Sequence, residues 1–275
     1  MRPRAGRNSA AAYWCGVLLH KLVCYGSKRR QYLGTYFLRN RAQLEQLRRL
    51  ITVRPGGSEI RVAILGCSIG AEVYSVRWAI RSARPDLQVK VCGVDTSAAV
   101  LEVAARAVYS DAVSGMVAQP IFERLTETER TEIFDWQAGV ATVKPAFREG
   151  VSFHLDDAAD PMLLDALGPQ DIVMASNFLC HMVPAKAEEC LRNLVRLVAP
   201  GGYVFVVGVD LDVRAKVARE LGWRPVTDLL REIHDGDPSL RRDWPWRWWG
   251  LEPLNERRAD WQLRYSAAYQ VSGGR

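Results

Sequence analysis

The sequence contains no long hydrophobic run. None of its apolar segments approaches the ~20 residues that a membrane-spanning helix needs, so no membrane association is expected. Residues Ala10 to Val23 are mildly apolar after a basic start, but His20 and Lys21 interrupt them and no clean cleavage site follows, which argues against a secretory signal peptide. We therefore expect a cytoplasmic protein.

Metal-binding and redox signatures are also absent from the sequence. The six cysteines are scattered and include no C-x-x-C pair, which disfavours a zinc site or a redox motif and fits free thiols in a reducing cytoplasm. There is no internal repeat, no low-complexity tract and no recognised nucleic-acid-binding motif. We therefore interpret the net charge of +6 as a solvated arginine-rich surface and expect no nucleic-acid partner.

What the sequence does contain is a strand, turn, helix and strand between residues 61 and 95. An apolar strand leads into the turn Gly66-Cys67-Ser68-Ile69-Gly70, Glu72 stands at the start of the following helix, and a second apolar strand ends on Asp95. The glycines would let the backbone pass close to a ligand, and a carboxylate at that strand end can accept hydrogen bonds from two ribose hydroxyls. The pattern predicts a site for an adenosine-containing cofactor.

Strands and helices alternate along the chain, whose 275 residues suffice for one large α/β domain. The predicted strands are residues 61–65, 89–94, 151–154, 171–175, 203–207 and 263–271. The predicted helices are residues 36–51, 72–81, 97–108, 125–136, 184–198, 213–221 and 226–234. This alternation is typical of a mostly parallel sheet with helices on both faces, which binds cofactors at the carboxyl ends of its strands. Asp95, Asp156 and Asn177 each follow a predicted strand, so we expect them on one rim with the glycine turn.

The residue at the start of the first helix of this pattern discriminates between cofactors. A nicotinamide dehydrogenase usually rests a pyrophosphate on that helix N-terminus, where the carboxylate of Glu72 would repel it. The same carboxylate suits S-adenosylmethionine, which has an α-ammonium and a sulfonium group and no phosphate. The charge pattern therefore favours a methyltransferase over a nicotinamide oxidoreductase.

The segment from Gly66 to Ser75 resembles the signature of the chemotaxis-receptor methyltransferase (CheR) family. Three further segments are similar to motifs of that family, namely Thr35–Arg39, Arg148–Phe153 and Ala175–His181. The resemblance runs from about Gly34 to Val209. It implies a Rossmann-like class I methyltransferase that uses S-adenosylmethionine and has a mostly parallel seven-stranded sheet.

The resemblance also implies roles for individual residues. Glu72 would bind the ammonium of the cofactor, Asp95 the ribose hydroxyls, and Asp156 would lie near the adenine. Thr35 and Arg39 would reach in from the preceding helix to the cofactor's carboxylate or to the substrate. The full set of predicted cofactor-binding residues is Thr35, Arg39, Gly66, Cys67, Ser68, Gly70, Glu72, Asp95, Thr96, Asp156, Asp157, Asn177 and Phe178. The predicted catalytic residues are His181 and Arg39.

Departures from the family pattern lie on the substrate side. Ser176 stands where the family has an arginine, His181 where it has a tyrosine, and Val209–Leu211 where it has a serine and a glutamate. The family's N-terminal receptor-docking domain is not evident. We therefore expect the same cofactor with a different acceptor, a hydroxyl or carboxylate of a small molecule rather than a protein. His181 would be either a general base for a hydroxyl acceptor or a residue that only hydrogen-bonds within its loop.

Two other functions stay open at this point, a protein-glutamate O-methyltransferase in chemotaxis-type signalling and a non-catalytic scaffold that binds the cofactor. We expect residues 1–52 to form an N-terminal tail and helical segment, and residues 53–275 to form the methyltransferase domain. Residues 236–262 would be a Trp- and Arg-rich insertion, with four tryptophans between Trp244 and Trp249. The insertion would be a lid over the acceptor, a small core of its own or a subunit contact. The oligomeric state is not predicted.

Overall fold

The computed structural model describes residues 34–111, 120–236, 250 and 252–272, together with Cys15, Leu18 and Leu22. The tryptophans from Trp244 to Trp249 and most of the N-terminal segment lie outside these residues, so the insertion and the division into domains stay predictions. Within the described ranges, no helix has both the length and the apolarity needed to cross a bilayer.

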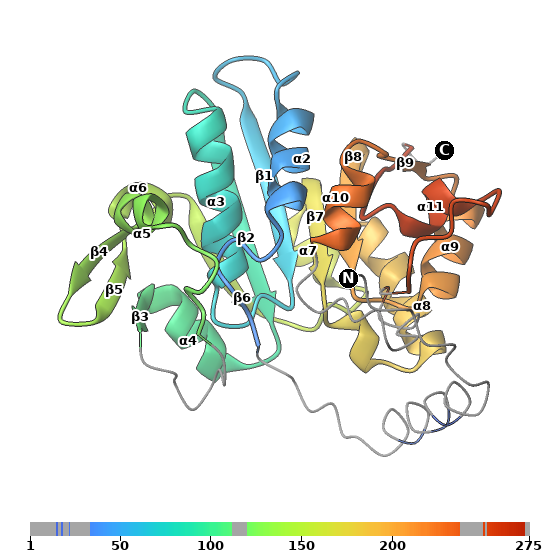
Figure 1. Ribbon diagram of the computed structural model, residues 1–275, viewed down its shortest axis with the longest axis horizontal. Helices are drawn as coiled ribbons and strands as arrows, with labels where there is room; N and C mark the ends of the chain where they lie inside the picture. Colours follow the sequence, from blue (N-terminus) through green and yellow to red (C-terminus); the bar gives the residue numbers. More distant parts are fainter. Residues whose placement is uncertain are drawn as a thin grey trace, which may run out of the picture.

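A seven-stranded sheet forms the centre of the molecule, with the strand order β6-β2-β1-β7-β8-β10-β9 (Figure 1). Its strands are β1 (Glu59–Leu65), β2 (Gln88–Asp95), β6 (Val151–Leu155), β7 (Gln170–Ser176), β8 (Val198–Val207), β9 (Arg224–Pro225) and β10 (Ala268–Gln270). Neighbouring strands from β6 to β8 are parallel, and β10 runs antiparallel to both β8 and β9. The prediction of an α/β fold with a mostly parallel seven-stranded sheet is therefore confirmed.

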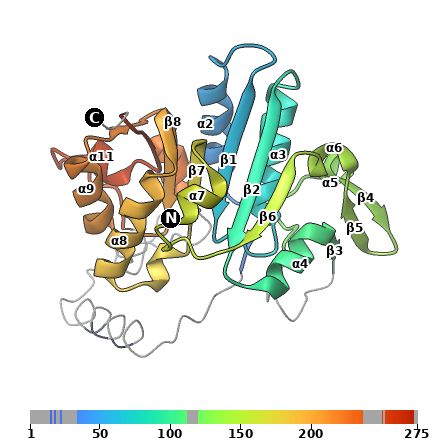
Figure 2. The same cartoon turned by 180° about the vertical axis from the view of Figure 1, so that it is seen from behind.

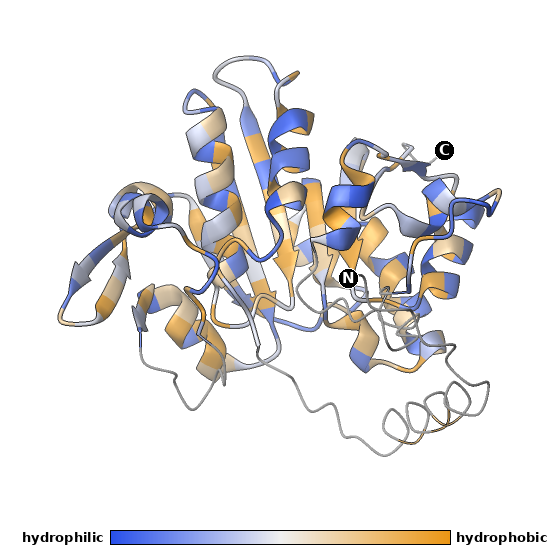
Figure 3. Cartoon of the chain, in the orientation of Figure 1, coloured by the Kyte–Doolittle hydropathy of each residue, from blue (hydrophilic) through white to orange (hydrophobic). Residues whose placement is uncertain are grey.

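Helices cover both faces of this sheet. The covering helices are α2 (Arg41–Ile51), α3 (Ala71–Ala83) and α4 (Ala98–Arg106) in one layer, and α7 (Leu163–Leu167), α8 (Pro184–Val195) and α9 (Leu211–Glu220) in the other. Alternate residues of β1 point to opposite layers, since Ile60, Val62 and Ile64 join the core with the first layer while Ala63 and Leu65 join the core with the second. Figures 1 and 2 show α3 and α7 on opposite sides of the sheet. The strands between them are mostly apolar, whereas the helices are polar on their outer faces (Figure 3).

A small antiparallel sheet lies beside the main one, at the left of Figure 1. It has the order β3-β5-β4 and consists of β3 (Val108–Ser110), β4 (Phe134–Gln137) and β5 (Val140–Val143), flanked by α5 (Glu127–Ile133) and α6 (Pro145–Arg148). The prediction of one helix over residues 125–136 is correct only for α5. The chain leaves the helix at Phe134 because that ring packs edge-on against Phe37 (4.9 Å between centroids) and Phe122 (5.3 Å).

The segment before α2 is a turn rather than part of the predicted helix. Asn40 is the N-cap of α2, and its side-chain oxygen accepts a hydrogen bond from the Gln43 N–H (3.2 Å). Leu38 has a positive φ of 51°, and its N–H donates to Ser75 Oγ at 3.0 Å. Arg39 therefore approaches the site from a turn that is hydrogen-bonded to α3, and not from a helix as the sequence predicted.

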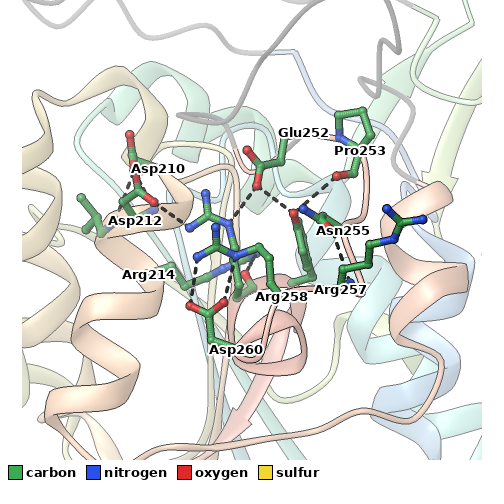
Figure 4. Close-up of polar contacts among 12 residues, drawn as sticks. Asp210, Asp212, Arg214, Glu252, Pro253, Asn255, Arg257, Arg258 and Asp260 are labelled. Carbon is green, nitrogen blue, oxygen red and sulfur yellow. Dashed lines mark hydrogen bonds and ion pairs between the residues drawn. The ribbon is translucent and has the colours of Figure 1, made fainter. Parts of the chain in front are cut away.

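The C-terminal part of the chain also differs from its prediction. Residues 263–271 were predicted as one strand, but the chain forms α11 (Trp261–Tyr265) before β10, while α10 (Leu230–Asp235) is shorter than predicted. The side chain of Arg264 is only 5% exposed and forms ion pairs with Glu252 (2.8 Å) and Asp212 (2.6 Å). Figure 4 shows the carboxylates of Asp212, Glu252 and Asp260 directed toward arginines that lie between them. This ion-pair network connects residues 252–265 to α9.

Candidate active site

The turn after β1 needs glycine at two positions. Gly66 has a φ of 68°, and a Cβ atom there would lie 2.9 Å from a ring carbon of Phe178. Gly70 has a φ of 84°, and a Cβ atom there would lie 2.9 Å from the Cβ of Ala104 in α4. The sequence predicted that the glycines let a ligand approach the backbone. In the structure they also let the turn pack against Phe178 and against α4.

Asp95 connects the glycine turn to the end of β2. The residue is 7% exposed, and its carboxylate accepts hydrogen bonds from the N–H groups of Ser68 (2.9 Å) and Ser97 (3.1 Å). One carboxylate oxygen can accept more than one hydrogen bond. The position at the carboxyl end of a central strand therefore suits ribose binding and also stabilises the turn. Thr96, which follows it, is exposed.

The two acidic residues after β6 shape their own loop. The N–H of Asp156 donates to the backbone oxygen of Asp95 (3.1 Å), which places the two strand ends side by side. The Asp156 carboxylate accepts the Asp157 N–H (2.7 Å), and the Asp157 carboxylate accepts the Ala159 N–H (2.9 Å). Both side chains are partly buried, and they extend the rim on the side of Asp95.

Glu72 lies on the opposite side of the glycine turn, in the first turn of α3. Burial raises the pKa of its carboxyl group, while the hydroxyl of Ser176 (2.6 Å to Oε1) and the positive charge of Arg39 oppose that shift. A raised pKa means that the surroundings do not fully replace the water that a carboxylate loses on burial. A cationic ligand group would take the place of that lost water, so the site fits the ammonium of S-adenosylmethionine.

A cleft opens beside Glu72. It lies between α3, the turn before α2, and the carboxyl ends of β7 and β8. Its lining residues are Tyr36, Arg39, Asn40, Gln43, Leu44, Glu72, Ser75, Met174, Ser176, Asn177 and Val207. Arg39, Glu72 and Asn177 were predicted as site residues. The other eight were not among the predicted site residues. The sequence pattern could have indicated Gln43, because this polar residue lies at helical spacing from the apolar Leu47 and Ile51, on the same face of the helix.

Asn177 and Phe178 lie in the bend that follows β7. Asn177 has a φ of 59°, and its N–H donates to the backbone oxygen of Val207 (2.9 Å). The neighbouring Gly208 has no room for a Cβ atom, which would lie 2.6 Å from the Cα of Asn177. This close approach of β7 and β8 brings Asn177 to the cleft, while Phe178 turns toward Gly66.

Eleven of the fourteen predicted site residues are not among those that line the cleft, and His181, Thr35 and Cys67 are three of them. His181 belongs to the short 3₁₀ helix η1 (Leu179–His181), where it is partly buried, and burial lowers the pKa of its imidazole. Thr35 is 9% exposed, and Cys67 is 2% exposed with a thiol pKa that burial raises well above its ordinary value. The Cys67 thiol therefore stays protonated and suits packing under the turn. In the part of the chain that the structure describes, no group of three or more His, Cys, Asp or Glu side chains could hold a metal ion.

The fold and this site define a class I methyltransferase that uses S-adenosylmethionine. The family model "CheR methyltransferase, SAM binding domain" matches residues 34–216. The chain belongs to that family, so the predicted family and cofactor are confirmed.

Three curated relatives are similar to this chain. "Uncharacterized 104.1 kDa protein in hypE 3'region" from Rhodobacter capsulatus is 26% identical over 254 residues, which cover 82% of this chain and 25% of that protein. "Probable biofilm formation methyltransferase WspC" from Pseudomonas aeruginosa is 29% identical over 212 residues, which cover 75% of this chain and 48% of that protein. "Chemotaxis protein methyltransferase 1" from the same organism is 28% identical over 158 residues, which cover 55% of this chain and 54% of that protein. The chain thus spans about half of the length of these relatives or less.

These relatives correct one prediction. The departures at Ser176 and His181 suggested a small-molecule acceptor in place of a protein. That expectation is wrong, because the family and the relative that is named a chemotaxis protein methyltransferase point to a protein substrate. The departure at Ser176 changes the shape of the cleft, since a serine hydrogen-bonded to Glu72 is much smaller than an arginine. Such a change does not by itself exchange one class of acceptor for another.

Proposed function

We propose that this protein is a protein-glutamate O-methyltransferase of the chemotaxis-signalling type, which works in the cytoplasm. The observation that carries the proposal is the presence of a cation and an anion, Arg39 and Glu72, in one cleft. Glu72 suits the ammonium of the cofactor, and Arg39 suits a carboxylate, to which a guanidinium donates charge-assisted hydrogen bonds. The family and the relatives support a protein as the source of that carboxylate.

The charges in the cleft also bear on the chemistry of the acceptor. A glutamate side chain has an ordinary pKa of about 4.3 and is ionised at neutral pH. Its oxygen is therefore a ready nucleophile, and no residue has to remove a proton from it. His181 lies outside the set of residues that line the cleft, which agrees with a reaction that needs no general base.

S-adenosylmethionine supplies an activated methyl group on a sulfonium. Glu72 would hold its amino-acid ammonium and Asp95 its ribose, on either side of the glycine turn. Arg39 would orient the acceptor carboxylate so that one oxygen faces the methyl carbon. The cofactor would supply its methyl group to that oxygen, and the electron pair of the broken carbon–sulfur bond would stay on sulfur. Holding the two reactants collinear is the main contribution of the protein.

The test is incubation of the purified protein with methyl-labelled S-adenosylmethionine and cytoplasmic fragments of bacterial chemotaxis receptors. The proposal expects label on the receptor fragment that mild base releases as methanol, since methyl esters hydrolyse in base and methyl ethers and amines do not. Receptor fragments whose methylated glutamates are replaced by glutamine are the matched control and should take up no label. Base-stable label, or none on any fragment, would contradict the proposal.

A further inference from the structure

Gln43 is a buried polar residue whose side-chain amide nitrogen has no hydrogen-bond partner within the described residues. The residue is 7% exposed, and its Nε2 atom has no hydrogen bond there. Its backbone N–H donates to the N-cap Asn40, so the orientation of the residue at the start of α2 is fixed. A buried amide group without a partner is costly, and a ligand would remove that cost because Gln43 lines the cleft next to Arg39.

Gln46, three residues further along the same helix, shows what a structural glutamine does here. It is 0% exposed, and its amide donates to the backbone oxygens of Val226 (3.4 Å) and Asp228. Gln46 therefore joins α2 to the segment before α10. Two neighbouring glutamines on one helix thus have different surroundings, one bonded to the backbone and one facing a cleft.

We propose that the side-chain amide of Gln43 donates a hydrogen bond to the acceptor carboxylate and thereby contributes to acceptor binding. This inference rests on the proposed function. A carboxylate has two oxygens, and only one attacks the methyl group. Arg39 and Gln43 would bind the other oxygen and so leave the attacking oxygen free. An uncharged donor beside the guanidinium adds a directed contact and no further charge.

The position of Gln43 favours the acceptor over the cofactor as its ligand. Glu72, Ser176 and Asn177 border the cleft on the side of the strand ends, where α/β folds bind their cofactors. Gln43 borders the cleft from α2, together with Arg39 of the preceding turn. An acceptor that meets a cofactor bound at the strand ends would therefore enter on this second side.

The test compares Gln43→Leu and Gln43→Glu with wild type, using a chemotaxis-receptor fragment as the probe. We expect Gln43→Leu to raise the KM for the fragment about tenfold, which corresponds to about 1.4 kcal/mol, and to change the Kd for S-adenosylhomocysteine less than twofold. Gln43→Glu should raise KM further, because a second carboxylate would repel the acceptor. The melting temperature of Gln43→Leu should equal or exceed that of wild type, since the substitution removes a buried amide without a partner.

Gln46→Leu is the matched control. It should lower the melting temperature and leave the KM for the fragment within twofold, because its amide is bonded to backbone oxygens and lies outside the cleft. An unchanged KM in Gln43→Leu, or a loss of S-adenosylhomocysteine affinity in place of the KM effect, would overturn the inference and leave the proposed function intact. A wild-type protein that forms no base-labile ester on any fragment would overturn both.

Discussion

Replacing Glu72 by glutamine should weaken the cofactor site and stabilise the protein without ligand. Burial raises the pKa of the Glu72 carboxyl group in the folded state, whereas in the unfolded chain a glutamate has its ordinary pKa of about 4.3. A raised folded-state pKa gives stability that is fully present below the unfolded pKa and is lost as pH rises through the folded value. Glutamine cannot ionise, so Glu72→Gln avoids that loss.

The size of the effect on binding follows from the contact that is removed. A hydrogen bond to a charged group is worth about 1.5–3 kcal/mol, so the Kd for S-adenosylmethionine should rise about 10- to 150-fold. The hydroxyl of Ser176 can still donate to the amide oxygen of glutamine at the position where it now donates to Oε1 (2.6 Å). The local packing should therefore persist, and the change should affect charge alone.

Calorimetric titration and urea unfolding at pH 4 and pH 7.5 measure both effects. We expect ligand-free Glu72→Gln to be more stable than wild type at pH 7.5 and equal to it at pH 4. Wild-type affinity should fall as pH falls through the raised pKa of Glu72, and the variant should lack that pH dependence. Glu45→Gln, an exposed charge removal on α2, is the control and should change neither quantity. Unchanged cofactor affinity in Glu72→Gln at pH 7.5 would refute the assignment.

Three further variants test other parts of the site and its support. Asp95→Ala removes the acceptor of the Ser68 N–H (2.9 Å) and should weaken S-adenosylhomocysteine binding at least tenfold by calorimetry; full affinity would exclude it from the ribose site. His181→Ala should keep that affinity and lose less than about tenfold in turnover at saturating cofactor, whereas removal of a general base costs about 10²–10⁴-fold. A loss of that size would favour a hydroxyl acceptor. Arg264→Met should cost about 3 kcal/mol in urea unfolding, because it leaves the partly buried Glu252 without its cation; an unchanged midpoint would show that the network does not stabilise the fold.

Local patterns predicted the cofactor side of the site correctly at the level of family and cofactor. The turn from Gly66 to Gly70, the carboxylate of Glu72 and the strand end at Asp95 lie within thirty residues of one another. Their geometry depends on one strand-turn-helix-strand unit, whose backbone conformation is set by nearby residues. For the same reason, the apolar runs predicted the strands that became β1, β2, β6, β7 and β8.

The errors in the prediction arise where a distant contact overrides a local preference. The helix predicted from Tyr36 begins at Arg41, because the turn before it donates hydrogen bonds to Ile121 and to Ser75. The strand predicted over residues 263–271 begins as a helix, because the buried Arg264 meets carboxylates of other segments. A helical or alternating pattern has no information about partners so far away in the sequence.

The sequence by itself determined the class of fold, the family and the cofactor, because each depends on residues that are close together along the chain. Only the tertiary structure decided the composition of the cleft. Arg39 and Gln43, Glu72, and Asn177 come from three separate parts of the chain. They meet because a parallel sheet brings its strand ends to one edge and α2 packs against α3 beside that edge. The sequence favoured a small-molecule acceptor because its substrate-side residues could be compared only one at a time. Their joint arrangement, with a cation, a buried amide and an anion around one space, is a property of the folded chain.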